Sequence, residues 1–208
     1  MARITGAKCR ICRRLGTKLF LKGTRCDTPK CPIEKDNKPP GQHGGKRIRL
    51  TEYGVHLREV QRAKKMYGIM QRQFRRYYDL AVASPGNSGE ILVQILERRL
   101  DNIVYRLRMG SSRAHARQLI LHGHIRVNGR RVTVPSFPIS AGDVIEPARR
   151  EKSQKVVKES IALRKDVGIP SWLKLAEEPP KGAVVSLPTS GELQVPLESQ
   201  LIVEYMSR

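Results

Sequence analysis

No run of apolar residues in this 208-residue chain approaches the roughly eighteen that a membrane-spanning helix needs. Its first residues, MARITGAKCRICRR, lack the continuous apolar segment of a secretory signal peptide, and no organellar transit peptide is evident. These absences exclude a membrane-spanning class and favour a soluble protein inside the cell.

The usual patterns of a catalytic site are missing as well. The sequence holds no paired carboxylates, no nucleophile beside a general base, and no glycine-rich phosphate loop that opens a helix. It also shows no internal repeat and no heptad pattern for a dimer seam of the kind that DNA regulators use. The sequence therefore predicts a protein that is not an enzyme.

Acidic residues are scarce relative to basic ones, and the imbalance is uneven. The whole chain carries 40 Lys and Arg against 19 Asp and Glu, a net charge of +21. Residues 1–80 hold 21 basic and 6 acidic residues, residues 81–150 hold 11 and 5, and residues 151–208 hold 8 of each. A charge of this size suits nucleic acid or an anionic membrane surface, and its distribution assigns the polyanion to the first two thirds of the chain.

Cysteine is absent after residue 31, but four cysteines precede that point. Cys9, Cys12, Cys26 and Cys31 form the pattern C-x2-C-x13-C-x4-C, which can place four thiolates around one tetrahedral ion. Structural zinc is the usual occupant, an iron–sulfur cluster on the same cysteines is the alternative, and disulfides suit a reducing compartment poorly. Basic residues around the site are expected to lower the thiol pKa values. Four protein ligands leave no open position, so the metal would be structural.

Lysine is absent between Lys65 and Lys152, whereas residues 98–150 hold eleven arginines. The planar guanidinium group grips phosphate with two hydrogen bonds and stacks on bases, which an ammonium group does not. Residues 100–107 have apolar side chains at helical spacing, and Gly110 ends that helix. Ser111 or Ser112 is a candidate cap for a second helix that ends near Gly123. Arginines 113 and 117 would share one face of it.

A hairpin is predicted directly after these two helices. Asn128-Gly129 is a strong two-residue turn signal between short strands at residues 125–127 and 130–132. A turn of this length would set Arg126 opposite Arg131. Like charges in that position are destabilising unless a polyanion lies on them.

These residues resemble a known RNA-binding module. SSRAHARQLILHGHIRVNGRRV at 111–132, preceded by ERRLDNIVYRLRMG at 97–110, is similar to the small module named after small-subunit ribosomal protein four. The module also occurs in pseudouridine synthases, some aminoacyl-tRNA synthetases and a heat-shock protein. The cysteine quartet, the PPGQHG loop at 39–44 and the final LIVEYMSR also resemble the bacterial ribosomal protein four family, in its cysteine-bearing, zinc-type form.

Resemblance and local patterns together predict an α+β fold in four parts. These are a four-cysteine metal module with a basic Pro/Gly arm at 1–45, a helical body at 46–96, a helix–helix–β-hairpin RNA-binding module at 97–150, and a C-terminal helix and strand segment at 151–208 that packs back on the body. Within them we expect a helix at 52–67 capped by Thr51, a helix at 69–81, a hinge at 84–89, a helix at 90–97 capped by Ser88, and a strand at 201–205.

The resemblance implies a structural component of the small ribosomal subunit, in the cytoplasm and not on a membrane. It would bind the 5′ domain of small-subunit (16S) ribosomal RNA at a multi-helix junction, help to nucleate assembly and affect translational accuracy. Its neighbours would be small-subunit ribosomal protein five and messenger RNA where it enters the subunit. The alternative is an RNA-modifying enzyme of the pseudouridine synthase type, or another RNA-binding factor with this module, but residues 151–208 are too few for a catalytic domain.

Pattern and resemblance also nominate the residues that would contact RNA, all of them basic or polar. They are Arg10, Arg13, Arg14, Gln42, His43, Lys46, Arg47 and Arg49 near the N-terminus; Arg58, Arg62, Arg72, Arg75 and Arg76 in the helical body; and Ser111, Ser112, Arg113, Arg117, Gln118, His124, Arg126, Asn128, Arg130 and Arg131 in the module.

Overall fold

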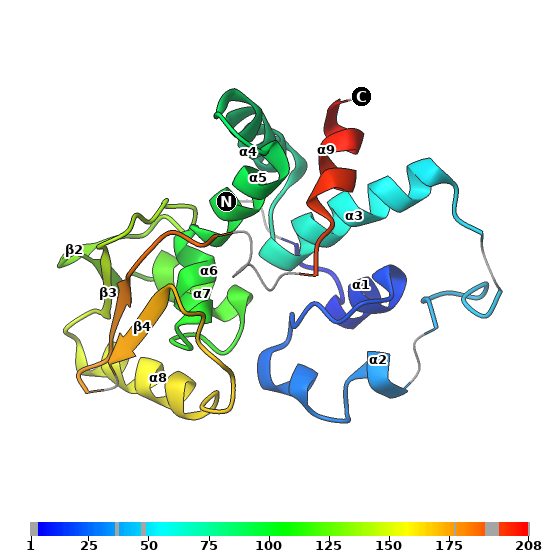
Figure 1. Cartoon of the computed structure of the whole chain (residues 1–208). Coiled ribbons are helices and arrows are strands. Elements are labelled where there is room, and N and C mark those ends of the chain that lie inside the picture. Colours follow the sequence, from blue (N-terminus) through cyan, green and yellow to red (C-terminus); the bar gives the residue numbers. More distant parts are fainter. Residues whose placement is uncertain (1–3, 36–37, 47–48, 177, 190–195, 208) are drawn as a thin grey trace. The chain divides into compact units, whose positions relative to one another are not determined.

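The computed structural model describes residues 4–35, 38–46, 49–176, 178–189 and 196–207, and the chain forms two compact units (Figure 1). Unit 1 comprises Met1–Val93 with Val195–Arg208, and unit 2 comprises Gln94–Gln194. The boundary therefore falls inside a helix, a few residues after the hinge expected at 84–89. No helix in the described residues is long and apolar enough to cross a membrane.

Unit 1 is helical over its described residues. Its elements are α1 (Lys8–Leu15), the 3-10 helix η1 (Gly23–Asp27), α2 (Pro32–Lys35), α3 (Glu52–Tyr67), α4 (Gln71–Ala83), the start of α5 (Ser88–Glu97), and α9 (Ser199–Ser207). The expectation of a helical N-terminal part is confirmed.

Helix α3 forms where the sequence predicts it. The Thr51 hydroxyl accepts a hydrogen bond from the Gly54 N–H at 3.2 Å, which supplies the expected cap. Gly68 ends the helix in the left-handed region with φ 66°. The next helix begins at Gln71 rather than at Ile69, because the Ile69 N–H donates to the Lys64 carbonyl and closes the end of α3 instead.

Helix α5 begins two residues before the predicted start. The Asn87 side chain accepts a hydrogen bond from the Gly89 N–H at 3.0 Å, so Asn87 takes the capping role that was assigned to Ser88. Ser88 is itself the first residue of the helix.

The strand predicted at residues 201–205 is wrong, because this segment is the helix α9. Ile202 and Met206 lie one turn apart and are both buried, and α9 runs beside α3 (Figure 1). The Glu59 carboxylate of α3 accepts a hydrogen bond from the Glu198 N–H at 3.0 Å, directly before α9 begins. Burial of one helical face therefore overrides the local strand preference of Leu201-Ile202-Val203.

Unit 2 combines helices with one antiparallel sheet. Its described elements are α6 (Leu100–Arg106), α7 (Arg113–Leu121), β1 (Ile125–Val127), β2 (Arg130–Arg131), β3 (Val144–Pro147), α8 (Glu151–Ala162), β4 (Leu173–Ala176) and β5 (Lys181–Val184). The strand order is β2-β1-β3-β5-β4. The predicted hairpin is confirmed, since Arg126 pairs with Arg131 across β1 and β2.

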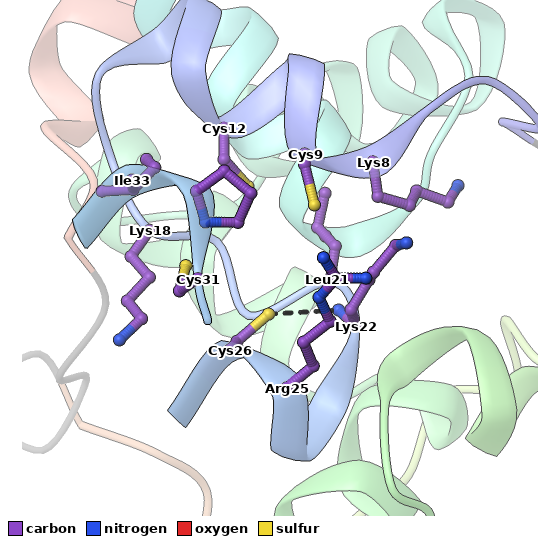
Figure 2. A pocket seen from close by; sticks show the side chains of 11 residues that line it. Lys8, Cys9, Cys12, Lys18, Leu21, Lys22, Arg25, Cys26, Cys31 and Ile33 are labelled. Carbon is purple, nitrogen blue, oxygen red and sulfur yellow. Dashed lines mark hydrogen bonds between the residues drawn. The ribbon is translucent and has the colours of Figure 1, made fainter. Parts of the chain in front are cut away.

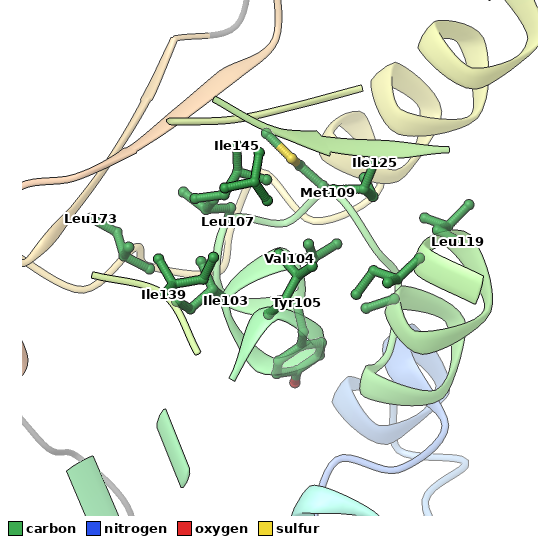
Figure 3. Close-up of a cluster of buried hydrophobic side chains, with 14 of the residues drawn as sticks. Ile103, Val104, Tyr105, Leu107, Met109, Leu119, Ile125, Ile139, Ile145 and Leu173 are labelled. Atoms are coloured by element: carbon green, nitrogen blue, oxygen red, sulfur yellow. The ribbon is translucent and has the colours of Figure 1, made fainter. Parts of the chain in front are cut away.

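The predicted apolar stripe of α6 forms the centre of the unit 2 core (Figure 3). Leu100, Ile103 and Val104 are at most 1% exposed, as is Leu107 directly after the helix. The same core takes in Trp172 from beyond the expected module.

The segment after residue 150 completes the sheet of unit 2. Strand β5 pairs with β3, with Ala183 opposite Val144, so α8 and the β4–β5 hairpin are part of unit 2 and not of the helical unit 1. Residues 151–208 are therefore not one part: α8 and the β4–β5 hairpin belong to unit 2, whereas α9 belongs to unit 1.

The close packing of Leu107 against Gly182 of β5 allows a test of how β5 joins the core of unit 2. A Cβ atom at Gly182 would lie 2.9 Å from Leu107 Cδ2 and still closer to Cδ1, and Leu107 is fully buried. We predict that Gly182→Ala lowers the free energy of unfolding by about 1–3 kcal/mol through overpacking, measured by urea denaturation. Gly168→Ala is the control, because a Cβ there meets nothing within 4 Å. Equal stability of the two variants would contradict the packing argument.

Candidate nucleic-acid interface

The start of α7 is organised by its own side chains. The Ser112 hydroxyl accepts a hydrogen bond from the His115 N–H at 3.2 Å, and the Ser111 N–H donates to His115 Nδ1 at 3.2 Å. Burial lowers the pKa of His115, with a smaller contribution from His124. The expected cap is thus confirmed as Ser112, and its hydroxyl oxygen already serves the helix.

Two arginines predicted to face phosphate also bind within the protein. Arg113 Nε donates to Asn102 Oδ1 at 2.9 Å, and its guanidinium carbon lies 4.5 Å from the Tyr105 ring centroid. Arg117 Nη1 lies 3.6 Å from Asp101 Oδ2. Phosphate binding by Arg113 and Arg117 stays a prediction, and both side chains tie α7 to α6 as well.

Tyr105 contacts a second guanidinium group besides that of Arg113. The Arg164 guanidinium carbon is 4.2 Å from the Tyr105 ring centroid. The Arg164 side chain is buried, and its Nη1 donates to the carbonyls of Tyr105 at 2.8 Å and Gly110 at 3.1 Å. Arg164 therefore joins the end of α8 to the turn between α6 and α7.

A buried charged cluster precedes α6. Arg99 Nε and Nη2 donate to the two Asp101 oxygens at 3.0 and 2.5 Å, with Arg99 only 1% exposed. The Glu97 carboxylate, also 1% exposed, accepts from Asn102 Nδ2 at 2.8 Å and from Arg106 Nη2 at 3.0 Å. Each buried charge finds a partner of the opposite sign or an amide, so removal of one partner would leave the other charge uncompensated.

The side chains of the paired hairpin residues Arg126 and Arg131 have different neighbours. Arg126 Nη2 donates to the Gly129 carbonyl within the turn. The Arg131 guanidinium lies over Gly123, where a Cβ atom would overlap it. Arg130 and Arg131 are exposed, so the hairpin presents positive charge to solvent.

The other residues of the module that were predicted to contact RNA differ in whether their side chains bind within the protein or are exposed to solvent. Asn128 bridges to Asp143 Oδ1 at 2.7 Å and accepts from the Val144 N–H at 2.8 Å, and His124 Nδ1 lies 2.9 Å from Ser153 Oγ. Gln118 is exposed on α7. Asn128 and His124 thus have structural partners, whereas Gln118 points to solvent.

The nominated residues of unit 1 also include some that bind within the protein and others that are exposed to solvent. Arg62 pairs with the buried Glu59 at 2.7 Å, and Arg75 pairs with Asp79 at 3.2 Å and donates to the Met206 carbonyl at 3.1 Å. The exposed members of the nominated set are Arg10, Arg14, Gln42, His43, Lys46, Arg49, Arg72 and Arg76, while Arg13 and Arg58 are half-buried. Arg47 lies outside the described residues.

The four cysteines line one small cavity (Figure 2). Cys9 and Cys12 come from α1, Cys26 from η1, and Cys31 stands directly before α2. All four are free thiols, and the cavity has a volume of about 20 Å³, enough for one water molecule or ion. As the side chains stand, no three His, Cys, Asp or Glu among the described residues are arranged to hold a metal ion.

The expectation that basic neighbours lower the thiol pKa values is wrong for two of the cysteines. Burial is the largest influence and raises the pKa of Cys12 and of Cys26 above the ordinary thiol value. The neighbouring cysteines raise both values further.

Sequence patterns missed Asn102, Tyr105 and Arg164 as parts of the site's framework. Arg164 stands in a mixed-charge segment, and nothing local distinguishes it from the exposed Lys165 beside it. For Asn102, the sequence offered one signal: the charged and polar residues of ERRLDN at 97–102 surround Leu100. Leu100 is fully buried, so its neighbours in the sequence also lie close to the core.

Comparison with known proteins matches both parts of the chain to family models. Residues 3–97 match the ribosomal protein S4/S9 N-terminal domain, and residues 98–145 match the S4 domain. Among curated proteins, the small ribosomal subunit protein uS4 of Thermodesulfovibrio yellowstonii is 48% identical and that of Dictyoglomus turgidum 51%, each over 208 residues. The protein of the same name from Geotalea uraniireducens is 52% identical over 210 residues. Each alignment covers 100% of both chains.

The contribution of the buried Arg164 side chain to the stability of unit 2 can be tested. We predict that Arg164→Met lowers the free energy of unfolding by roughly 2–3 kcal/mol, because the Tyr105 and Gly110 carbonyls lose a charged donor in a buried place. The measurement is chemical denaturation followed by circular dichroism. Lys165→Met is the matched control at an exposed neighbouring position. A decrease no larger than that of the control would show that the buried guanidinium is dispensable.

Proposed function

Because the chain belongs to the small ribosomal subunit protein uS4 family, we propose that it is a structural component of the small ribosomal subunit and binds the small-subunit (16S) ribosomal RNA directly. The observation that carries this is full-length similarity to proteins of that name, together with an S4 domain whose hairpin presents Arg130 and Arg131 to solvent. The ribosome in the cytoplasm is its place of action.

Enzymatic activity is not expected of such a component. The S4 domain match ends at residue 145, and the described residues beyond it are used to complete the sheet of unit 2 and to cover α3 of unit 1. The pseudouridine synthase alternative is not favoured, because the relatives that match over their full length are named small ribosomal subunit proteins.

The finer features of the proposal rest on the resemblance of the sequence motifs to the family. The RNA partner is a multi-helix junction in the 5′ domain, and binding there helps to nucleate assembly of the subunit. Its neighbours in the small subunit are small-subunit ribosomal protein five and the messenger RNA where it enters the subunit. The protein also affects the accuracy of translation. The strong positive charge, +21 overall, supports a partner that is a folded polyanion.

Exposed hairpin arginines provide the direct test of RNA binding. We predict that changing Arg130 and Arg131 to Ala weakens binding to a 5′-domain transcript and flattens the slope of log affinity against log salt by about 0.7–0.9 for each phosphate that the protein no longer binds. Binding would be measured by filter retention at several salt concentrations. Lys155→Ala with Lys158→Ala is the control, because these exposed lysines on α8 give the same change of charge. Equal slopes in both folded double variants would exclude the hairpin as a phosphate-binding surface.

We also propose that Cys9, Cys12, Cys26 and Cys31 hold one structural Zn²⁺, with an iron–sulfur cluster as the alternative on the same cysteines. Support comes from the shared cavity, the free thiols and the spacing of the pairs. Among residues 4–35, the buried hydrophobic residues are Leu19 and three of these cysteines. A region with so small an apolar core suits stabilisation by metal–thiolate bonds, which would hold α1, η1 and α2 together.

Metal content and local stability test the cysteine proposal. We predict about one zinc per chain by elemental analysis, and its loss in Cys26→Ser. Hydrogen exchange in that variant should rise across residues 8–35 and stay unchanged in unit 2, since the two units have separate cores. Iron with equimolar sulfide would assign the cluster instead. Metal-free protein with unchanged exchange in Cys26→Ser would refute both.

A further inference from the structure

A groove in unit 1 lies between α1 and α3, two helices in direct contact, and has a volume of about 540 Å³. That volume is in the range of pockets that take small organic groups. Pro40 and Leu50, from the segment that precedes α3, also line the groove. We call this feature the α1–α3 groove.

The lining combines apolar side chains, which we call the apolar floor, with basic side chains, which we call the rim. Ile11 and Leu15 of α1 and Leu57 of α3 supply branched aliphatic side chains. The charged lining residues are Arg10, Arg14, Arg58 and Lys65, and no Asp or Glu among the described residues lines the groove. An apolar pocket with only cations around it is complementary to a flat, weakly polar group attached to anions.

These four cations differ from other basic residues of unit 1. Arg62 and Arg75 each pair with a carboxylate, at 2.7 and 3.2 Å. No salt bridge in the described part of the chain involves Arg10, Arg14, Arg58 or Lys65. Their charge is therefore not neutralised within that part of the protein and is available to an external anion.

Both helices that line the groove contribute cations. Arg10 and Arg14 are four residues apart and share one face of α1. Arg58 and Lys65 are two turns apart along α3, a span of roughly 10 Å. A polyanionic chain in the groove would therefore meet cations from both helices.

We propose that the α1–α3 groove binds one unstacked nucleotide of the ribosomal RNA, an inference that rests on the function proposed above. The base lies against Ile11, Leu15 and Leu57, and the flanking phosphates lie on the rim. Proteins recognise folded RNA sequence-specifically at bases that leave the stack, and arginine planes and apolar side chains receive such bases. The groove would thus select for a bulged or junction nucleotide over a continuous duplex.

Helix α1 links this groove to the cysteine cavity. Cys9 and Cys12 line the cavity, whereas Ile11 and Leu15 of the same helix line the groove. The short α1 buries only Cys12, so the position of one wall of the groove depends on the cysteine region.

The test uses the full chain and a transcript of the small-subunit RNA 5′ domain. Gln61→Trp fills the groove from the half-buried face of α3 and removes no cation. Leu57→Glu adds a carboxylate to the apolar floor. Leu163→Glu is the matched control, since it makes the same substitution at a leucine that is 66% exposed in unit 2. Thermal melts confirm that each variant is folded.

We expect Gln61→Trp and Leu57→Glu to weaken binding by about tenfold or more, because the base loses its contact with the apolar floor, while Leu163→Glu stays within about twofold of the parent. Gln61→Trp should leave the salt slope unchanged, because all four cations remain. Probing the complexes with dimethyl sulfate should reveal one nucleotide that the parent protects and Gln61→Trp exposes.

The outcomes separate this inference from the function on which it rests. If the parent and Leu163→Glu fail to bind the transcript, RNA binding itself is refuted. If both bind and the two groove variants bind equally well with an unchanged footprint, the groove receives no nucleotide. Normal RNA binding by the groove variants, combined with failure to enter assembled subunits, would identify a protein-docking groove and overturn the inference.

Discussion

The buried polar cluster around α6 is the constraint on which the rest of unit 2 depends. Glu97 and Arg99 are each 1% exposed, and each meets a partner on α6: Arg106 for Glu97 and Asp101 for Arg99. Removing one partner would leave a buried charge uncompensated, at a cost of several kcal/mol. The segment from Glu97 to Arg106 is therefore held in one arrangement, in which Arg99 and Arg106 bind within the protein.

Positive charge consequently has two uses in this protein. Arg164 and Arg62 stabilise the fold by binding buried carbonyls or a buried carboxylate. Arg130 on the hairpin and Arg14 at the α1–α3 groove are exposed and have no salt bridge in the described residues. The net charge of +21 predicts a polyanionic partner, but only part of that charge is available to it.

Elements with strong local signals were predictable from the sequence. Helix α3 has a Thr51 cap and a terminal Gly68, and the β1–β2 hairpin has the Asn128-Gly129 turn, so both formed as expected. The segment at 201–205 was mispredicted because its apolar residues suit a strand or a helix, and only burial against α3 selects the helix. The role of residues 151–184 was also missed, since strand pairing between β3 and β5 joins residues about forty positions apart.

The sequence by itself determined the class of partner and the family of the chain, because a motif, a turn dipeptide and a net charge are properties of order and composition. It also nominated the four cysteines, whose spacing is a local property. Only the tertiary structure decided that Arg113 stacks on Tyr105, that residues 151–184 close the sheet, and that α1 and α3 enclose a groove. The physical reason is that a guanidinium group binds whichever carbonyl, carboxylate or ring folding brings within a few ångströms, and sequence spacing does not encode that distance.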